Sequence, residues 1–529
     1  MGTEYKNGIS VYYEQAASRL YLNLYARIHA RAIHRYRGTP QDQRPRISEH
    51  SAVEGRDLAH YLIVGALRYL LENEADDSSD ITLRNAAQIL EKLYIDEPSD
   101  FPARTEELYT TALAYYLAGY YPRAFVIMHG VSPSEESSQN LIRLMFIRQL
   151  AKIKDITLKN LSKENARDSF LANSTQQGDI TEIDAINFAF EGTLNRIYSL
   201  FYEYARTGTE DLIHQALDLS SIGRQLAIDQ HSQVWWWIFQ CTLALLREYH
   251  RNSLWTCLQP MMDEDSSYLV QRYIKAAFYR SPWPILELWR SQSHVVEYIK
   301  DDKSYCLKMP TSSGKTRIAE LAILKFLLDT QAAPGKKCIY IAPYRALAVE
   351  IEQSLSRSFQ PIGVGVSQLY GSYDLNPAES LLVDESRILI ATPEKMDAFL
   401  RYNPEIAQQV GLIIVDEGHI IDADERGLRY ELFLHRLLRR YERNGVRTFF
   451  ISAVMPDAEQ FSQWITSRDS KEGVLETDWR ASQLLLGILS WDGERGRVDY
   501  TYRDRDQVDQ TFFIPNYFAC EVEPLLWRP

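Results

Sequence analysis

The stretch MPTSSGKT (Met309–Thr316) contains the residue types that bind a polyphosphate. Small residues let successive backbone N–H groups curl around phosphate oxygens, and the N-terminus of a following helix adds partial positive charge. A lysine at position 315 can reach the β- and γ-phosphates, and a hydroxyl at position 316 can coordinate Mg²⁺. The candidate nucleotide-binding residues are Thr311, Ser312, Ser313, Gly314, Lys315 and Thr316.

One residue of this stretch departs from the usual phosphate-loop pattern. That pattern has a glycine where this chain has Met309. A chance turn on a surface loop is therefore an alternative interpretation of the Gly-Lys-Thr sequence.

A second group of reactive residues ends the apolar run in LIIVDEGH (Leu412–His419). Asp416 is suited to hold Mg²⁺ together with Thr316, and Glu417 is suited to polarise an attacking water. The alternative is a solvated acidic loop, because charges are common at strand ends. The position of this pair downstream of a Gly-Lys-Thr loop favours the catalytic interpretation.

Short apolar runs separated by helical segments surround both motifs. Strands buried on both faces and joined by helices form a doubly wound, mainly parallel α/β sheet, whose ligands lie at the carboxyl ends of the strands. The runs typical of strands are 304–309, 336–343, 364–371, 387–392, 411–417 and 447–453, and helical spacing occurs in 317–328, 346–359 and 429–442.

The region before this sheet reads as helices, with apolar residues every three or four positions. We therefore divide the chain into an all-helical domain (1–280), an α/β domain (281–480) and a linker or incomplete further domain (481–529). The segment 112–124 is similar to half of a tetratricopeptide-type hairpin, but no clean repeat follows it. The helical region either packs on its neighbour or serves as a docking platform for a partner protein.

Composition restricts the class of protein. With 45% hydrophobic and 24% charged residues the chain is an ordinary globular sequence, and its net charge of −13 argues against a broadly basic nucleic-acid binder. The five cysteines form no CxxC pair, so neither a zinc site nor a disulfide framework is predicted. We find no run long enough to cross a membrane and no signal peptide, and we expect a cytoplasmic protein.

Five motifs in order resemble those of the superfamily 2 DExH helicases, and most closely the Ski-like branch. They are MPTSSGKT, APYRALAVE (342–350), ATPEK (391–395), DEGH (416–419) and SAVMP (452–456). The resemblance implies a RecA-like fold, ATP and Mg²⁺ as cofactors, and a catalytic set of Lys315, Asp416, Glu417 and His419. Helicases of this superfamily often lack the first glycine, which accounts for Met309.

The resemblance also assigns residues outside the phosphate loop. It implies that Gln292 reads the adenine edge. It also implies that Ser452 and Ala453 couple the ATP state to how tightly the protein holds a nucleic-acid strand. The residues it places along a nucleic-acid strand are Arg345, Gly371, Thr392 and Lys395. From the residues alone, Arg345 could cap a helix or pair with Glu350, Thr392 could be an N-cap, and His419 could be a core histidine.

These motifs predict an ATP-dependent helicase or translocase acting on DNA or RNA, single-stranded or with an overhang. The alternative is an ATP-gated sensor or scaffold that holds an effector nuclease. A long helical extension before such a core resembles the Hachiman-type helicases of bacterial anti-phage systems, which implies an effector docked on the helical domain. We expect the second RecA-like domain to lie beyond residue 529 or on another chain, and residues 1–529 alone to be poorly active.

Overall fold

The computed structural model describes most of the chain. The described residues are 2–16, 18, 21, 49–71, 73, 75–96, 105–131, 139–161, 182–262, 267–300, 303–311, 313–331, 333, 335–369, 377–418, 425–441, 446–453, 459, 462–464, 473–477, 479, 486–491, 495–501 and 508–515.

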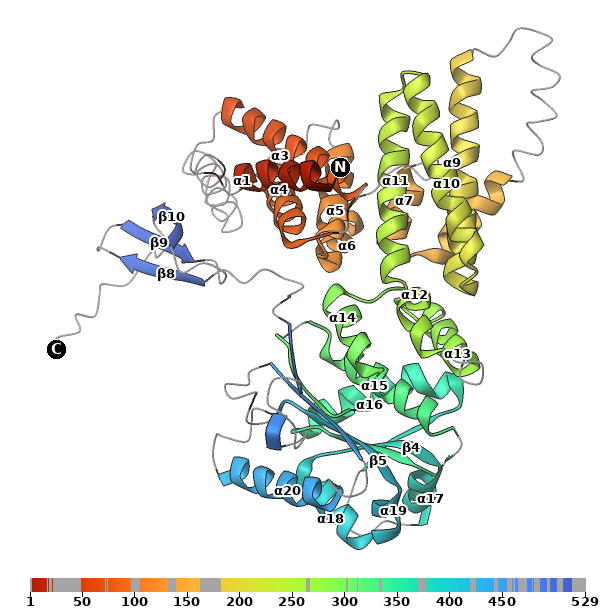
Figure 1. Cartoon of the computed structure of the whole chain (residues 1–529), viewed down its shortest axis with the longest axis vertical. Helices are drawn as coiled ribbons and strands as arrows, with labels where there is room; N and C mark the ends of the chain where they lie inside the picture. Colours follow the sequence, from red (N-terminus) through yellow and green to blue (C-terminus); the bar gives the residue numbers. More distant parts are fainter. Residues whose placement is uncertain are drawn as a thin grey trace, which may run out of the picture. The chain divides into compact units, whose positions relative to one another are not determined.

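Up to residue 278 the described chain is helical, as the apolar spacing predicts (Figure 1). None of the helices in the described ranges is long and apolar enough to cross a membrane. Residues 150–161 are also helical. The named helices are α1 (Gly2–Ala16), α3 (Glu49–Leu70), α4 (Asp77–Asp96), α5 (Thr105–Leu117), α6 (Tyr121–His129), α7 (Gln139–Phe146), α9 (Glu182–Thr207), α10 (Glu210–Asp229), α11 (Gln233–Asn252), α12 (Leu254–Leu258), the 3₁₀ helix η3 (Gln259–Met261) and α13 (Ser267–Phe278).

The three consecutive tryptophans at the start of α11, residues 235–237, differ in how deeply they are buried. Trp235 is buried, contacts the rings of Phe190 and Phe239, and donates from Nε1 to Asn187 Oδ1 at 2.8 Å. Trp236 and Trp237 remain half-buried. Adjacent helical residues point in different directions, so the triplet forms no flat surface for stacking bases.

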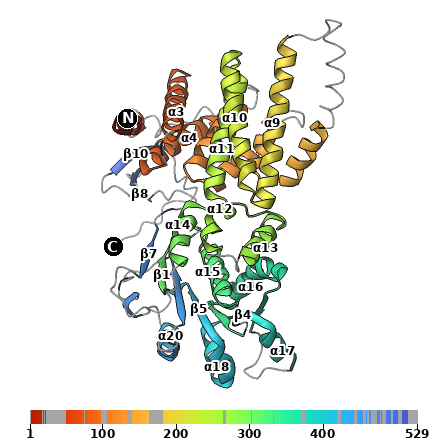
Figure 2. The ribbon, with the colours of Figure 1, turned by 45° about the vertical axis from the view of Figure 1, so that its right-hand side comes forward.

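The second half of the described chain is a RecA-like domain built on a seven-stranded parallel sheet, in the order β3-β4-β2-β5-β6-β1-β7. This confirms the predicted fold class. Figure 2 shows β7 beside β1 at one edge. The strands are β1 (Tyr305–Lys308), β2 (Lys337–Ile341), β3 (Gly365–Gln368), β4 (Ser386–Ala391), β5 (Val410–Asp416), β6 (Arg447–Ser452) and β7 (Val474–Glu476).

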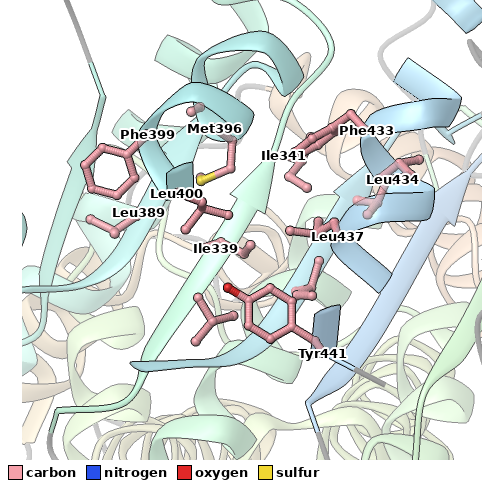
Figure 3. Close-up of a cluster of buried hydrophobic side chains, with 14 of the residues drawn as sticks. Ile339, Ile341, Leu389, Met396, Phe399, Leu400, Phe433, Leu434, Leu437 and Tyr441 are labelled. Carbon is pink, nitrogen blue, oxygen red and sulfur yellow. The ribbon is translucent and has the colours of Figure 1, made fainter. Parts of the chain in front are cut away.

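Helices connect these strands and cover both faces of the sheet (Figure 1). On one face, α18 (Pro393–Tyr402) and α20 (Glu425–Tyr441) pack against Ile339, Ile341 and Leu389 through Met396, Phe399 and Leu437 (Figure 3). The helices of the domain are α14 (Arg290–Ile299), α15 (Lys315–Asp329), α16 (Arg345–Phe359), η4 (Gln360–Ile362), α17 (Pro377–Glu385), α18 (Pro393–Tyr402), α19 (Pro404–Gln409) and α20 (Glu425–Tyr441).

Three further strands follow this domain. They are β8 (Leu486–Trp491), β9 (Arg495–Thr501) and β10 (Val508–Pro515), and they form an antiparallel sheet in the order β10-β9-β8. The start of a second RecA-like domain after residue 480 stays a prediction.

By its internal contacts the chain divides into two compact units. One holds residues 1–199, 216–246 and 481–529, and the other holds residues 200–215 and 247–480. The last helical residues before the sheet, including α12 and α13, therefore belong to the same unit as the RecA-like domain.

Candidate nucleotide site

The phosphate-loop residues follow β1 at the carboxyl edge of the sheet. Ser313 is fully buried, and its hydroxyl donates to the Pro310 carbonyl at 2.6 Å, which closes the turn. Gly314 has φ of 82° and a Cβ there would lie 2.0 Å from Gln292 Nε2, so the position requires glycine. Lys315 is the first residue of α15, and Thr316 follows it half-buried in the first helical turn.

Gln292 reaches this loop from α14. Its side-chain oxygen accepts from the Trp289 backbone N–H at 2.9 Å, which caps the helix, and its amide nitrogen donates to the Gly314 carbonyl at 3.4 Å. Gln292 is 5% exposed. The structure thus places Gln292 against the phosphate loop, and its contact with adenine stays a prediction.

Asp416 and Glu417 stand at the end of β5, on the same edge of the sheet as the loop. Lys315 Nζ lies 2.5 Å from Glu417 Oε1, although the two residues are 102 positions apart in the chain. Asp416 is 6% exposed and accepts from the Glu417 backbone N–H at 2.9 Å. The loop cation and both acidic residues therefore share one cluster.

Burial dominates the electrostatics of Asp416. Removal from water raises the pKa of the Asp416 carboxyl above its ordinary value, and the charge of Glu417 acts in the same direction. The hydroxyl of Tyr340 and the ammonium of Lys315 oppose this rise. A divalent cation bound here would favour the ionised carboxylate, and the carboxylate and hydroxyl oxygens of Asp416 and Thr316 are ligand types that Mg²⁺ prefers.

The backbone at Glu417 is left-handed, with φ of 49°. This conformation is uncommon outside glycine and costs of the order of 1 kcal/mol, and it is characteristic of functional sites. The next residue, Gly418, packs against the ring of Phe450, and a Cβ at Gly418 would lie 1.9 Å from that ring. The glycine in DEGH therefore allows the chain to turn directly over β6.

The remaining predicted residues are spread along the carboxyl edge. Arg345 opens α16 after β2 and is exposed, and within the described ranges it has no ion pair, so the alternative of a pairing with Glu350 is not observed there. Thr392 precedes α18 in the N-cap position, but its hydroxyl makes no cap hydrogen bond. Lys395 lies half-buried in the first turn of α18.

Ser452 is the last residue of β6, lies beside Lys308 and is fully buried. Its carbonyl accepts a hydrogen bond from the Met309 N–H at 2.9 Å. Ala453 follows it directly in the chain. The site residues Ser312, Gly371 and His419 lie outside the described residues. The roles of all these side chains stay predictions.

A sequence model of the DEAD/DEAH box helicases matches residues 289–461. This segment is a DEAD/DEAH box helicase domain. The helicase domain thus covers strands β1 to β6, the phosphate loop and the acidic pair described above, and it confirms the resemblance drawn from the motifs.

Relatives extend the similarity beyond the helicase domain. The chain is 32% identical over 441 residues to the Hachiman protein HamB of Bacillus cereus, which covers 81% of this chain and 37% of HamB. It is 30% identical over 207 residues to the ATP-dependent DNA helicase Hel308 of Methanococcus vannielii, covering 39% of this chain and 26% of that protein. The chain therefore spans well under half the length of these relatives.

Among solved structures, the DUF1998 helicase MrfA bound to DNA aligns with a TM-score of 0.32 and 20% identity, covering 39% of this chain and 29% of that chain. Mss116p bound to ssRNA and AMP-PNP aligns with a TM-score of 0.34 and 19% identity, covering 40% of this chain and 43% of that chain.

A buried polar network next to the phosphate loop was missed from the sequence. Arg317, in the first turn of α15, lies 2.5 Å from Glu320, and both contact the hydroxyl of Tyr273 on α13. Tyr273 and Glu320 are each 1% exposed. Two opposite charges three residues apart, in a stretch of α15 whose other residues from 318 to 324 are apolar, were the signal in the sequence. The network ties the helix that carries Lys315 to the helical segment before the helicase domain.

We expect Tyr273→Phe to lower the free energy of unfolding by about 1.5–3 kcal/mol, because it removes a buried hydroxyl bonded to two charged groups. Urea denaturation of the purified protein measures this. Tyr279→Phe, at a residue that is 66% exposed just after α13, is the matched control and should change little. Equal stability of the two variants would contradict a stabilising role for the network.

Proposed function

We propose that the chain binds ATP with Mg²⁺ and hydrolyses it to move along or unwind nucleic acid. The observation that carries this proposal is the clustering of Lys315, Glu417 and the buried Asp416 at one edge of the helicase domain. A basic residue for phosphates, a carboxylate for a metal and a second carboxylate for water are the parts that phosphoryl transfer needs.

In this proposal each residue has one task. The loop from Thr311 to Thr316 holds the phosphates through backbone N–H groups, and Lys315 leaves Glu417 to contact the β- and γ-phosphates. Thr316 and Asp416 hold Mg²⁺, which when bound neutralises charge developing on the γ-phosphate. Glu417, released from Lys315, orients the attacking water and accepts its proton.

Nucleic acid would lie along the carboxyl edge beside this cluster. The N-termini of α16 and α18 follow the neighbouring strands β2 and β4, and helix N-termini attract phosphates. Arg345 is exposed there, and the Thr392 hydroxyl makes no cap bond within its helix. These features support phosphate contacts, which bind strands without reading their sequence.

The similarity to HamB supports a role in anti-phage defence, with an effector protein as partner. The proposal for the whole protein is therefore a defence helicase whose ATP hydrolysis responds to nucleic acid. A strand-displacement assay would distinguish this helicase from the alternative, an ATP-gated scaffold that does not unwind nucleic acid.

The test is ATP turnover of the purified full-length protein, since residues 1–529 alone are expected to be poorly active, with and without single-stranded DNA or RNA. We expect at least one of them to stimulate ATP turnover. The Arg345→Ala protein should need about ten-fold more nucleic acid for half-maximal stimulation. The salt dependence of its nucleic-acid binding should fall by the amount that corresponds to about one phosphate contact. Arg357→Ala, at the other end of α16, is the matched control. No stimulation by either nucleic acid, or equal effects of both variants, would refute this proposal.

A further inference from the structure

Tyr340 occupies an unusual position in the sheet. It lies on β2 and is fully buried. Its partner in the register is Ile414 on the adjacent strand β5, so Asp416 is two residues further along the same face. A tyrosine side chain is long enough to reach such a diagonal neighbour. Its hydroxyl donates to Asp416 Oδ2 at 2.7 Å.

The Asp416 carboxylate is therefore held at both oxygens. Tyr340 bonds to Oδ2, and the Glu417 backbone N–H donates to Oδ1 at 2.9 Å. An ionised carboxylate has about four lone-pair sites, so each oxygen keeps one for a further ligand. The two bonds fix the plane of the carboxylate at the sheet edge without using up its capacity to bind a cation.

We propose that Tyr340 is a positioning residue for the metal-binding carboxylate of this site. Its hydroxyl orients Asp416 so that the remaining lone pairs face the metal, and it compensates the carboxylate for the loss of water. This inference rests on the proposed function, in which Asp416 holds Mg²⁺. Hydrogen-bond partners of metal ligands act in this way, and their loss lowers metal affinity by about 10- to 100-fold.

The experiment uses Mn²⁺ as the probe, because electron paramagnetic resonance reports the free ion directly. Mn²⁺ is titrated into the protein saturated with ADP, and ADP binding is measured separately in EDTA. Tyr340→Phe removes only the hydroxyl, and we expect Mn²⁺ to bind about 10- to 100-fold more weakly with ADP affinity unchanged. Equal weakening of Mn²⁺ and metal-free ADP binding would mean a general structural role and overturn the inference.

Tyr441→Phe is the matched control. Tyr441 is also buried in the helicase domain, and its hydroxyl donates to the Ala407 carbonyl at 2.8 Å, in the core on the α20 side of the sheet (Figure 3). Its loss should leave Mn²⁺ binding unchanged. A drop as large as that of Tyr340→Phe would refute a specific effect of Tyr340.

Asp416→Asn separates the inference from the proposed function. If Asp416→Asn leaves Mn²⁺ binding unchanged, the proposed metal site itself is wrong. If Asp416→Asn weakens binding and Tyr340→Phe does not, only the positioning role fails. In the double variant Tyr340→Phe should add no further loss to Asp416→Asn, because both act on one carboxylate. The double variant buries no uncompensated charge, so it provides a test even if Tyr340→Phe alone is unstable, and a further ten-fold loss there would overturn the inference.

Discussion

Glu417→Gln is expected to slow ATP hydrolysis by about a hundred-fold or more while ATP still binds. Glutamine keeps the size of the side chain and can keep the left-handed backbone, but it cannot accept a proton from water. In the structure Glu417 also holds Lys315 at 2.5 Å, so removing its charge frees the lysine for phosphate. ATP affinity should therefore be unchanged or higher, and the ATP-bound protein should stay longer on nucleic acid.

Single-turnover hydrolysis of radiolabelled ATP measures the chemical step, and a fluorescent ATP analogue measures binding. Glu431→Gln, at an exposed position of α20, is the matched control and should hydrolyse ATP at the wild-type rate. If Glu417→Gln reduced binding and hydrolysis by the same factor, Glu417 would be a structural residue and the assigned base would be wrong.

Lys315→Ala is expected to reduce ATP turnover to background and to weaken nucleotide binding by about 10- to 100-fold, the equivalent of one strong charge-assisted contact. The substitution removes the cation that faces the β- and γ-phosphates. It also leaves Glu417 without the lysine as its ion-pair partner, so a negative charge would face the incoming phosphates and add to the loss of affinity.

Steady-state ATPase assays and calorimetric titration with ADP, both on the full-length protein, test this result. Lys336→Ala is the matched control, since Lys336 is an exposed lysine just before the amino end of β2, the opposite end of that strand from the site. Wild-type turnover in the Lys315→Ala protein would refute the assignment of this loop.

Much of the helicase domain could be predicted from the sequence, because its signals are local. The predicted strands at 304–309 and 411–417 correspond to β1 and β5, and the helix after Gly314 corresponds to α15. Buried parallel strands are short apolar runs, and their ligands lie at their carboxyl ends whatever the order of the strands. The direction of the strands was therefore enough to predict which edge of the sheet carries Lys315 and Asp416.

By itself the sequence determined the phosphate loop, the acidic pair and the sheet edge that both occupy, since each depends on residues close together in the chain. Only the tertiary structure decided that Glu417 pairs with Lys315, that Tyr340 bonds to Asp416, and that Tyr273 bridges Arg317 and Glu320. These contacts join residues on different strands and helices. The Tyr340 contact depends on the register of β2 beside β5, the Lys315 contact on the order of the strands, and the Tyr273 contacts on the packing of α13 beside α15. No local pattern of residue types encodes any of these.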